Sequence, residues 1–172
     1  LTAAEYPMVK KGQIITGYYQ TQMRGTLTKA LLNKEAVIFS YERGADKNGY
    51  YPMLAPMSEL TGKVAFLLGS HYLFNTEGGE GLLVGGYRSD DAAHVTILGA
   101  GNSGQAALHY ACGLGAKVTV LNRDYQKLIM IKKERPAVTI LELTEENIRK
   151  ILPTTDLLIN TIRYQGEPLV TK

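Results

Sequence analysis

The sequence predicts an α/β protein built on parallel strands. From residue 94 onward, apolar strand patterns alternate with amphipathic helical patterns, and a second, shorter region upstream repeats the strand-helix-strand order. The predicted strands cover residues 94–98, 117–121, 138–141 and 156–161, and the predicted helices cover residues 103–113, 125–134 and 145–152, the last capped by Thr144. Such alternation requires parallel neighbouring strands joined by right-handed crossovers.

The upstream region has weaker but recognisable patterns. Residues 13–19 are typical of a short buried strand, and residues 27–33 of a helix with Leu27, Ala30 and Leu31 on one face. Residues 36–40 form a second predicted strand, and the glycine- and aspartate-containing stretch 41–49 predicts a loop or hairpin turn. These elements predict a small α/β unit ahead of the larger one.

One long amphipathic helix is predicted between the two regions. Leu60, Val64 and Leu68 recur at helical spacing across residues 58–74, and Ser58 is a candidate N-cap. Residues 77–86 contain five glycines, which predicts a flexible connection with a short apolar turn inside it.

Composition excludes several classes of protein. The 172 residues are 45% hydrophobic and 20% charged, as in ordinary globular chains, and a net charge of +3 is too small to indicate nucleic-acid binding. A single cysteine, Cys112, excludes an internal disulfide and is expected to be a buried small hydrophobe. Without a signal peptide or a membrane-length apolar run, we expect a cytoplasmic protein with no membrane partner. No spacing of histidine, cysteine or acidic residues suggests a metal.

A glycine-rich motif follows the strand 94–98. Gly99, Gly101 and Gly104, with Asn102 and Ser103 between them, form a complete G-x-G-x-x-G between a strand and a helix. In this context Gly99 permits the tight turn, Gly101 lets the backbone approach a pyrophosphate, and Gly104 permits close helix packing. The helix start adds a positive dipole end for the phosphates. The motif therefore predicts a Rossmann-like, dinucleotide-binding domain.

The end of the second strand bears on the choice of cofactor. A carboxylate there would bind the ribose of NAD and repel the 2′-phosphate of NADP, but this chain has Asn122. Arg123 could pair with a phosphate, and Lys127 one turn later could add positive charge. Two other interpretations stay open: Arg123 as a solvated residue held by Asp124, and Asp124 as the ribose ligand. The charges favour NADP over NAD.

Several motifs together resemble one family. They are LAPMSE at residues 54–59, TEGG at 76–79, GLLVGG at 81–86, and the glycine motif with GLGAKVTVL at 113–121. With these segments the chain resembles the alanine dehydrogenase and nicotinamide nucleotide transhydrogenase family. The resemblance implies part of a substrate domain at residues 1–56, a connecting helix and linker at 57–86, and a Rossmann domain at 87–172 that is incomplete at its C-terminal end.

The resemblance also implies site residues. Ser58 would contact the cofactor pyrophosphate, Lys127 would lie near the adenosine ribose, Thr144 near the adenine, and Thr161 on the nicotinamide side. Where alanine dehydrogenases have a catalytic histidine, this chain has Gln20, which cannot shuttle a proton near neutral pH.

Catalytic residues are therefore expected to be missing from the polypeptide. The family's substrate-binding arginine and lysine would lie upstream of Leu1, and its catalytic aspartate beyond Lys172. We expect a piece of a longer enzyme, which binds a dinucleotide and does not turn over by itself. His71, His94 and His109 are expected to be packed or surface residues rather than catalysts.

The resemblance leaves competing functions. The first is an NAD(P)-dependent amino-acid dehydrogenase of alanine dehydrogenase type, acting on a small amino or keto acid as a homo-oligomer. The second is an NADPH-dependent reductive enzyme similar to carboxyethylornithine synthase, favoured by Arg123. The third is a nucleotide-binding module like the soluble domain of transhydrogenase, or a cofactor sensor, without catalysis; fold alone does not decide between them.

Overall fold

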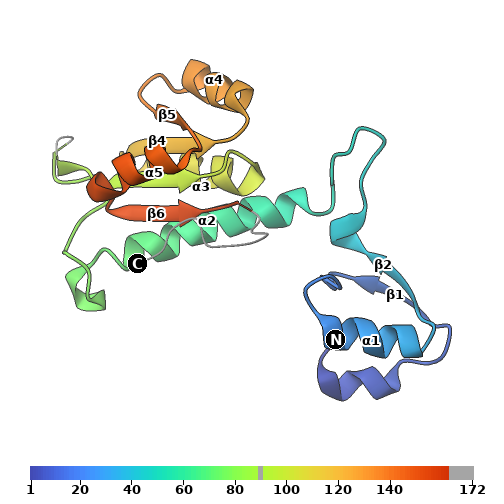
Figure 1. The fold of residues 1–172 in the computed structure, drawn as a ribbon. Helices are drawn as coiled ribbons and strands as arrows, with labels where there is room; N and C mark the ends of the chain where they lie inside the picture. The colour runs from blue at the N-terminus through green and yellow to red at the C-terminus, as the bar shows by residue number, and fades with distance from the viewer. Residues whose placement is uncertain (89–90, 163–172) are drawn as a thin grey trace. The chain divides into compact units, whose positions relative to one another are not determined.

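The computed structural model describes residues 1–88 and 91–162 and confirms the α/β class (Figure 1). The chain divides into two compact units, Leu1–Met57 and Ser58–Lys172. Each unit contains a sheet whose strands are all parallel, a two-stranded sheet in the first and a four-stranded sheet in the second.

The first unit is a strand-helix-strand arrangement. Strand β1 (Ile14–Gly17) leads through α1 (Gly25–Asn33) to β2 (Val37–Ser40), and the two strands pair in parallel from Ile14↔Val37 to Gly17↔Ser40. A short 3-10 turn, η1 (Ala3–Met8), precedes β1, and another, η2 (Tyr41–Arg43), follows β2. The core of this unit is formed by Val9, Tyr19, Leu27 and Leu31.

The prediction of a buried strand at residues 13–19 is wrong for one face of the sheet. Ile14, Val37 and Phe39 are 71%, 56% and 52% exposed, whereas Ile15 and Ile38 on the other face pack against the α1 core. Side chains of a strand alternate between faces, and within the described residues the single helix covers only one of them.

Helix α2 (Ala55–His71) begins earlier than predicted. Ser58, expected as the N-cap, lies inside the helix, so the capping prediction is wrong. Pro56 occupies the first turn, where a missing N–H breaks no intrahelical bond and the fixed φ suits the helix. The helix ends at His71 rather than residue 74, and a 3-10 turn, η3 (Asn75–Glu77), follows.

The second unit has the predicted order of elements. In its sheet, the strands lie side by side in the order β5 (Thr139–Glu142), β4 (Lys117–Asn122), β3 (His94–Leu98) and β6 (Leu157–Asn160). The connecting helices are α3 (Asn102–Gly113), α4 (Tyr125–Glu134) and α5 (Glu145–Ile151), with η5 (Leu152–Thr154) before β6. The central pair, β3 and β4, is in register from His94↔Lys117 to Leu98↔Leu121. The predicted parallel sheet is confirmed.

The two faces of this sheet are covered by different helices. Val95 and Ile97 of β3 pack in one cluster with residues of α2, α3 and α4, whereas Leu98 and Leu121 pack in another with Ile148 of α5. The alternation follows the two-residue period of a strand. Strands covered on both faces are expected in a doubly wound α/β unit.

The glycine-rich connection after α2 is packed closely. The N–H groups of Gly81 and Leu82 both donate to the Leu73 carbonyl at 2.9 and 3.0 Å, and the predicted apolar turn is present with Val84 buried. A Cβ at Gly85 would lie 2.3 Å from the Leu114 carbonyl oxygen, so the backbones approach closely there. The prediction of a flexible connection with an apolar turn inside it therefore missed a packing role for its glycines. Among the described residues, no helix has the length and apolarity needed to cross a membrane.

Candidate functional site

The glycine motif lies at the carboxyl edge of the four-stranded sheet. β3 stands between β4 on one side and β6 on the other, so the strand order changes direction at this point. Open parallel sheets bind ligands in the crevice outside the carboxyl ends of the strands at such a switch point. The loop Gly99–Gly104 follows β3, Asn122 is the last residue of β4, and Thr161 follows β6, so all of them lie at this edge.

Two glycines of the motif are required by the fold. Gly99 has a φ of +103°, and a Cβ there would lie 2.6 Å from the Thr161 hydroxyl oxygen. A Cβ at Gly104 would lie only 2.0 Å from the carbonyl oxygen of Gly99, because the helix start packs directly on the turn. Replacing either residue forces backbone movement.

Gly101 is different, because nothing in the described ranges 1–88 and 91–162 requires a glycine at this position. Its φ of −79° is accessible to any residue, and a Cβ placed there meets no atom within 4 Å. A glycine in open space at the mouth of a loop leaves room for a group outside the chain to approach the backbone closely. The geometry fits a pyrophosphate passing over the backbone.

The start of helix α3 is open as well. Its N-cap residue, Gly101, has no side chain to accept from the first-turn N–H groups. By contrast, the Asp124 carboxylate caps α4, and the Thr144 hydroxyl caps α5 by accepting from Asn147 N–H at 3.2 Å. Of these three helices, only the one after the glycine motif directs an uncapped N-terminus at the carboxyl edge, where it attracts an anion.

Helix α2 packs against the beginning of α3. The Ser103 hydroxyl donates to the Ser58 carbonyl at 2.7 Å, and a Cβ at Gly62 would lie 2.0 Å from the Ser103 carbonyl oxygen. This contact brings Ser58 beside the glycine motif. The half-buried Ser58 hydroxyl makes no hydrogen bond within the described ranges 1–88 and 91–162 and is available to a ligand, whereas the Ser103 hydroxyl is engaged.

Asn122 is engaged by the protein itself. Its Oδ1 accepts from the Ala100 N–H at 3.2 Å, and its Nδ2 donates to the Asp124 carbonyl at 3.0 Å. Both ends of the amide are therefore used within the edge of the sheet. These two bonds fix the orientation of the amide and leave it one further N–H and one further lone pair for a ligand.

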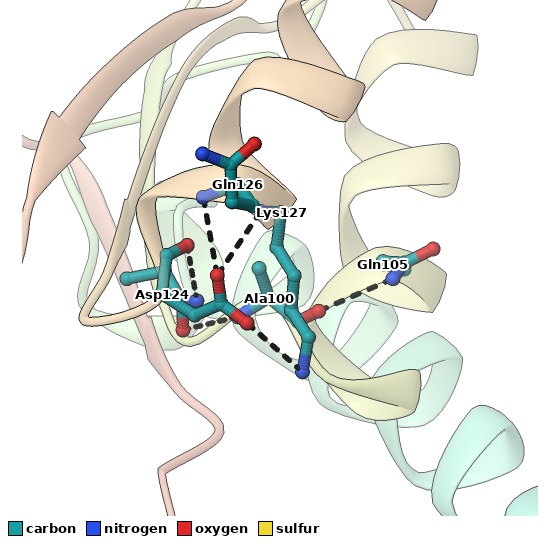
Figure 2. A network of polar contacts seen from close by, with 6 residues as sticks. Ala100, Gln105, Asp124, Gln126 and Lys127 are labelled. Atoms are coloured by element: carbon teal, nitrogen blue, oxygen red, sulfur yellow. Dashed lines mark hydrogen bonds and ion pairs between the residues drawn. The ribbon is translucent and has the colours of Figure 1, made fainter.

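The charged residues after Asn122 form a small cluster (Figure 2). The Asp124 carboxylate accepts from the backbone N–H groups of Gln126 and Lys127 at 3.1 and 3.4 Å, and Lys127 Nζ lies 3.9 Å from its other oxygen. Arg123 is exposed and makes no hydrogen bond or ion pair in the part of the chain that the structure describes. Asp124 is thus a helix cap. Arg123, next to it in the chain, is an exposed positive charge with no partner in those residues.

The two threonines expected at the site have structural bonds. The Thr161 hydroxyl donates to the Leu98 carbonyl at 2.8 Å and holds β6 beside β3. The Thr144 hydroxyl caps α5, and its chain neighbour Leu143 donates to the Asn122 carbonyl at 3.0 Å. Both residues lie at the carboxyl edge, with their hydroxyls already bonded.

In the first unit, Gln20 lies beyond the end of β1 in an unusual conformation. Its φ is +48°, and its N–H donates to Glu42 Oε1 at 2.6 Å. The Ser40 hydroxyl donates to the same oxygen at 2.8 Å. A pocket of about 290 Å³ lined by Thr21, Ser40, Arg43 and neighbouring residues opens beside the end of β2.

The sequence reasoning missed Glu42. The residue is 8% exposed, and its Oε2 atom has no hydrogen-bond partner among the residues that the structure describes. Burial alone would raise the pKa of its carboxyl group, but hydrogen bonds from backbone groups and Ser40 outweigh burial and lower the pKa below 4.5. The available signal was topological, since residues just after two parallel strands meet at one edge.

None of the three histidines joins these sites. His94 bonds the Thr154 carbonyl at 2.7 Å and the Thr119 hydroxyl at 2.8 Å, at the amino edge of the sheet. His71 lies 3.3 Å from Glu77, and His109 contacts Arg135 at 3.3 Å. Cys112 is half-buried, and burial raises the pKa of its thiol. No group of three or more potential metal ligands occurs among the described residues.

The parallel sheet, the glycine loop and the uncapped α3 define a Rossmann-like nucleotide-binding unit. The profile of the alanine dehydrogenase/PNT C-terminal domain matches residues 65–171. The chain belongs to the alanine dehydrogenase and nicotinamide nucleotide transhydrogenase family, as the sequence motifs predicted.

Individual relatives agree with this assignment. Alanine dehydrogenase from Bilophila wadsworthia is 38% identical over 165 residues, which are 95% of this chain and 44% of that protein. Alanine dehydrogenase from Methanococcus maripaludis is 36% identical over 164 residues, again 95% and 44%. The chain therefore spans less than half the length of these curated relatives.

Solved structures show the same fold. An L-alanine dehydrogenase superposes with a TM-score of 0.81 at 29% identity, covering 92% of this chain and 44% of that chain. A transhydrogenase from Sinorhizobium meliloti has a TM-score of 0.73 at 16% identity, covering 97% and 49%.

Proposed function

We propose that this chain carries the nucleotide site and part of the substrate site of an NAD(P)-dependent amino-acid dehydrogenase of alanine dehydrogenase type. The reaction is hydride transfer between the nicotinamide and the α-carbon of a small amino or imino acid. Family membership supports the class, and the single observation that carries the assignment is the open glycine loop. Gly101 faces empty space in front of the uncapped α3.

Each part of the loop has a distinct role in this proposal. The bound cofactor supplies a hydride acceptor or donor, which no side chain can provide. The α3 N-terminus and the Gly101 backbone hold the pyrophosphate, and the Ser58 hydroxyl donates to it from the adjacent helix. Gly99 and Gly104 keep the turn tight enough to present these groups.

The charges favour NADP over NAD. At the end of β4, within the described residues, no free carboxylate is placed to accept both ribose hydroxyls, because the strand ends in the amide of Asn122 and the Asp124 carboxylate caps α4. Arg123 is exposed and uncommitted, and Lys127 partly neutralises Asp124. A 2′-phosphate would gain attraction from Arg123 and meet little net repulsion.

A second candidate rests on Gln20. An amide at the position of the family's histidine cannot accept and release a proton near neutral pH, so this chain alone is expected not to turn over. The same residue favours a binding module like the soluble domain of transhydrogenase, which presents a nicotinamide without acid-base chemistry. Arg123 instead favours a reductive NADPH enzyme similar to carboxyethylornithine synthase.

Titration of the chain with NADH and with NADPH, at low and moderate salt, tests the proposal. We expect both to bind and NADPH to bind roughly tenfold more tightly, with a preference that shrinks as salt rises. Arg123→Ala should remove most of the preference, while Lys133→Ala, which removes an exposed charge at the other end of α4, should leave it. Equal binding of NADH and NADPH to the unaltered chain would refute the NADP assignment, and binding of neither would refute the site.

A further inference from the structure

The peptide groups of Ala100 are held by two side-chain amides from different elements. Asn122 at the end of β4 accepts from the Ala100 N–H at 3.2 Å, and Gln105 in the first turns of α3 donates through Nε2 to the Ala100 carbonyl at 3.2 Å (Figure 2). Ala100 is 1% exposed, so water does not replace these partners. A buried peptide with either group unpaired would be costly.

The residue types suit this arrangement. Asn122 must accept from Ala100 and donate to the Asp124 carbonyl at the same time, which an amide can do and an ionised carboxylate cannot. Gln105 bonds two successive residues, since its backbone N–H also donates to the Gly101 carbonyl at 2.9 Å. The middle of the glycine loop is thereby tied to β4 on one side and to α3 on the other.

Such a tie determines the shape of the loop before any ligand arrives. Gly99 and Gly101 on either side of Ala100 are the most flexible residues of the turn, and ordering them on binding would cost conformational entropy. Bonds to the peptide groups on both sides of Ala100 remove that freedom in advance, and a rigid site binds more tightly because less conformational freedom is lost on binding.

We propose that Asn122 and Gln105 are positioning residues that clamp the Ala100 peptide and preorganise the Gly99–Gly104 loop for the pyrophosphate common to NAD and NADP. The proposal rests on the proposed nucleotide site and refines it. Asn122 holds the loop in place and does not bind the ribose. The charges of Arg123 and Lys127 discriminate between the two cofactors.

The test compares Asn122→Ser and Gln105→Met with the unaltered chain. Each variant loses one clamp bond, and each should weaken NADH and NADPH by the same factor, roughly three- to tenfold, as expected for one neutral hydrogen bond. Gln126→Met is the matched control, because the side-chain amide of Gln126 makes no hydrogen bond within the described residues. Unequal factors for the two nucleotides would overturn the proposal, since they would make the clamp residues readers of the ribose.

The two variants should also be coupled. Because the two bonds hold the adjacent peptide groups on either side of one residue, the double variant should lose less affinity than the product of the single losses, whereas independent effects would multiply. A merely structural role would lower the melting temperature of both variants without this coupling, and that result would overturn the clamp.

Amide hydrogen exchange at Ala100 gives a readout that needs no nucleotide. Exchange should be slow in the unaltered chain and in Gln126→Met, and at least tenfold faster in Asn122→Ser. Unchanged exchange in Asn122→Ser overturns the clamp. If the unaltered chain binds neither nucleotide but shows the predicted exchange pattern, the nucleotide function fails while the clamp on the peptide is supported.

Discussion

Gly101→Ala should separate nucleotide binding from stability. The added Cβ meets no protein atom within 4 Å, and the residue has an ordinary φ of −79°. Alanine reduces the freedom of the unfolded chain, which stabilises by up to about 1 kcal/mol, while its poorer capping costs a similar amount. We therefore expect the free energy of unfolding to change by less than about 1 kcal/mol.

The effect on binding should be much larger. A methyl group where the pyrophosphate crosses the backbone must push the phosphate outward from the α3 N–H groups, and those bonds are charge-assisted. Loss of one such bond costs about 1.5–3 kcal/mol, which is a factor of roughly 10 to 100 in affinity. NADH and NADPH should both be affected, because they share the pyrophosphate.

Gly104→Ala supplies the opposite case. Its Cβ would lie 2.0 Å from the Gly99 carbonyl oxygen, whereas real Cβ atoms essentially never lie within 3.0 Å of another heavy atom. The backbone must therefore move by about an ångström. Overpacking of this kind costs about 1–3 kcal/mol or more and should lower the melting temperature by several degrees.

Calorimetry on the two variants, with binding measured by nucleotide fluorescence, makes the comparison. The expected pattern is a weakly binding, stable Gly101→Ala and a destabilised Gly104→Ala. If Gly101→Ala binds both nucleotides as tightly as the unaltered chain, no phosphate passes over this loop, and the reasoning from open space at Gly101 is refuted.

Three further predictions concern stability and charge. Because the folded-state pKa of Glu42 is below 4.5, its contribution to stability is complete above pH 4.5 and is lost as pH falls through the lower folded pKa. In urea titrations at several pH values, Glu42→Gln should reduce the acid-induced fall in the free energy of unfolding, and an unchanged pH profile would contradict this prediction. Gly62→Ala should lower the melting temperature more than Gly69→Ala, because its Cβ would lie 2.0 Å from the backbone oxygen of Ser103, whereas the Cβ at Gly69 would meet a movable methyl group of Leu157 at 2.6 Å. Equal shifts in melting temperature would count against the α2–α3 contact. Asp124→Ala should cost about 1 kcal/mol by uncapping α4 and should strengthen NADPH relative to NADH in titrations, so a fall in relative NADPH affinity would refute the role given to the carboxylate.

The sequence predicted the second unit well because local patterns specify it. The strand 94–98 and the helix at Tyr125–Glu134 were predicted at their observed bounds, since apolar periodicity, turns and caps agree there. The Thr144 cap of α5 was likewise predicted. The start of α2 was missed because Ser58 was given more weight than Pro56, whose place in a first helical turn was the better signal.

The sequence predicted which residues lie at the site, but not which hydrogen bonds their side chains make. The sequence brings Asn122, Thr144 and Thr161 to the carboxyl edge, but their side chains bond the protein, which depends on distances between elements. Topology brings Glu42 to the same edge as Gln20 but does not distinguish it from its neighbours, because its significance comes from burial and from its bond to Gln20 across the ends of two strands. Tertiary hydrogen bonds leave no periodic trace in a sequence.

Strand β6 is fastened to β3 at both of its ends. The Asp156 carboxylate accepts from the His94 N–H at 2.7 Å, and the Thr161 hydroxyl donates to the Leu98 carbonyl at 2.8 Å, contacts separated by 62 and 63 residues along the chain. Such distant contacts carry a larger loop-closure entropy than the adjacent β3-α3-β4 segment. We therefore expect β6 to dock late in folding, so that Asp156→Ala accelerates unfolding and leaves the folding rate nearly unchanged.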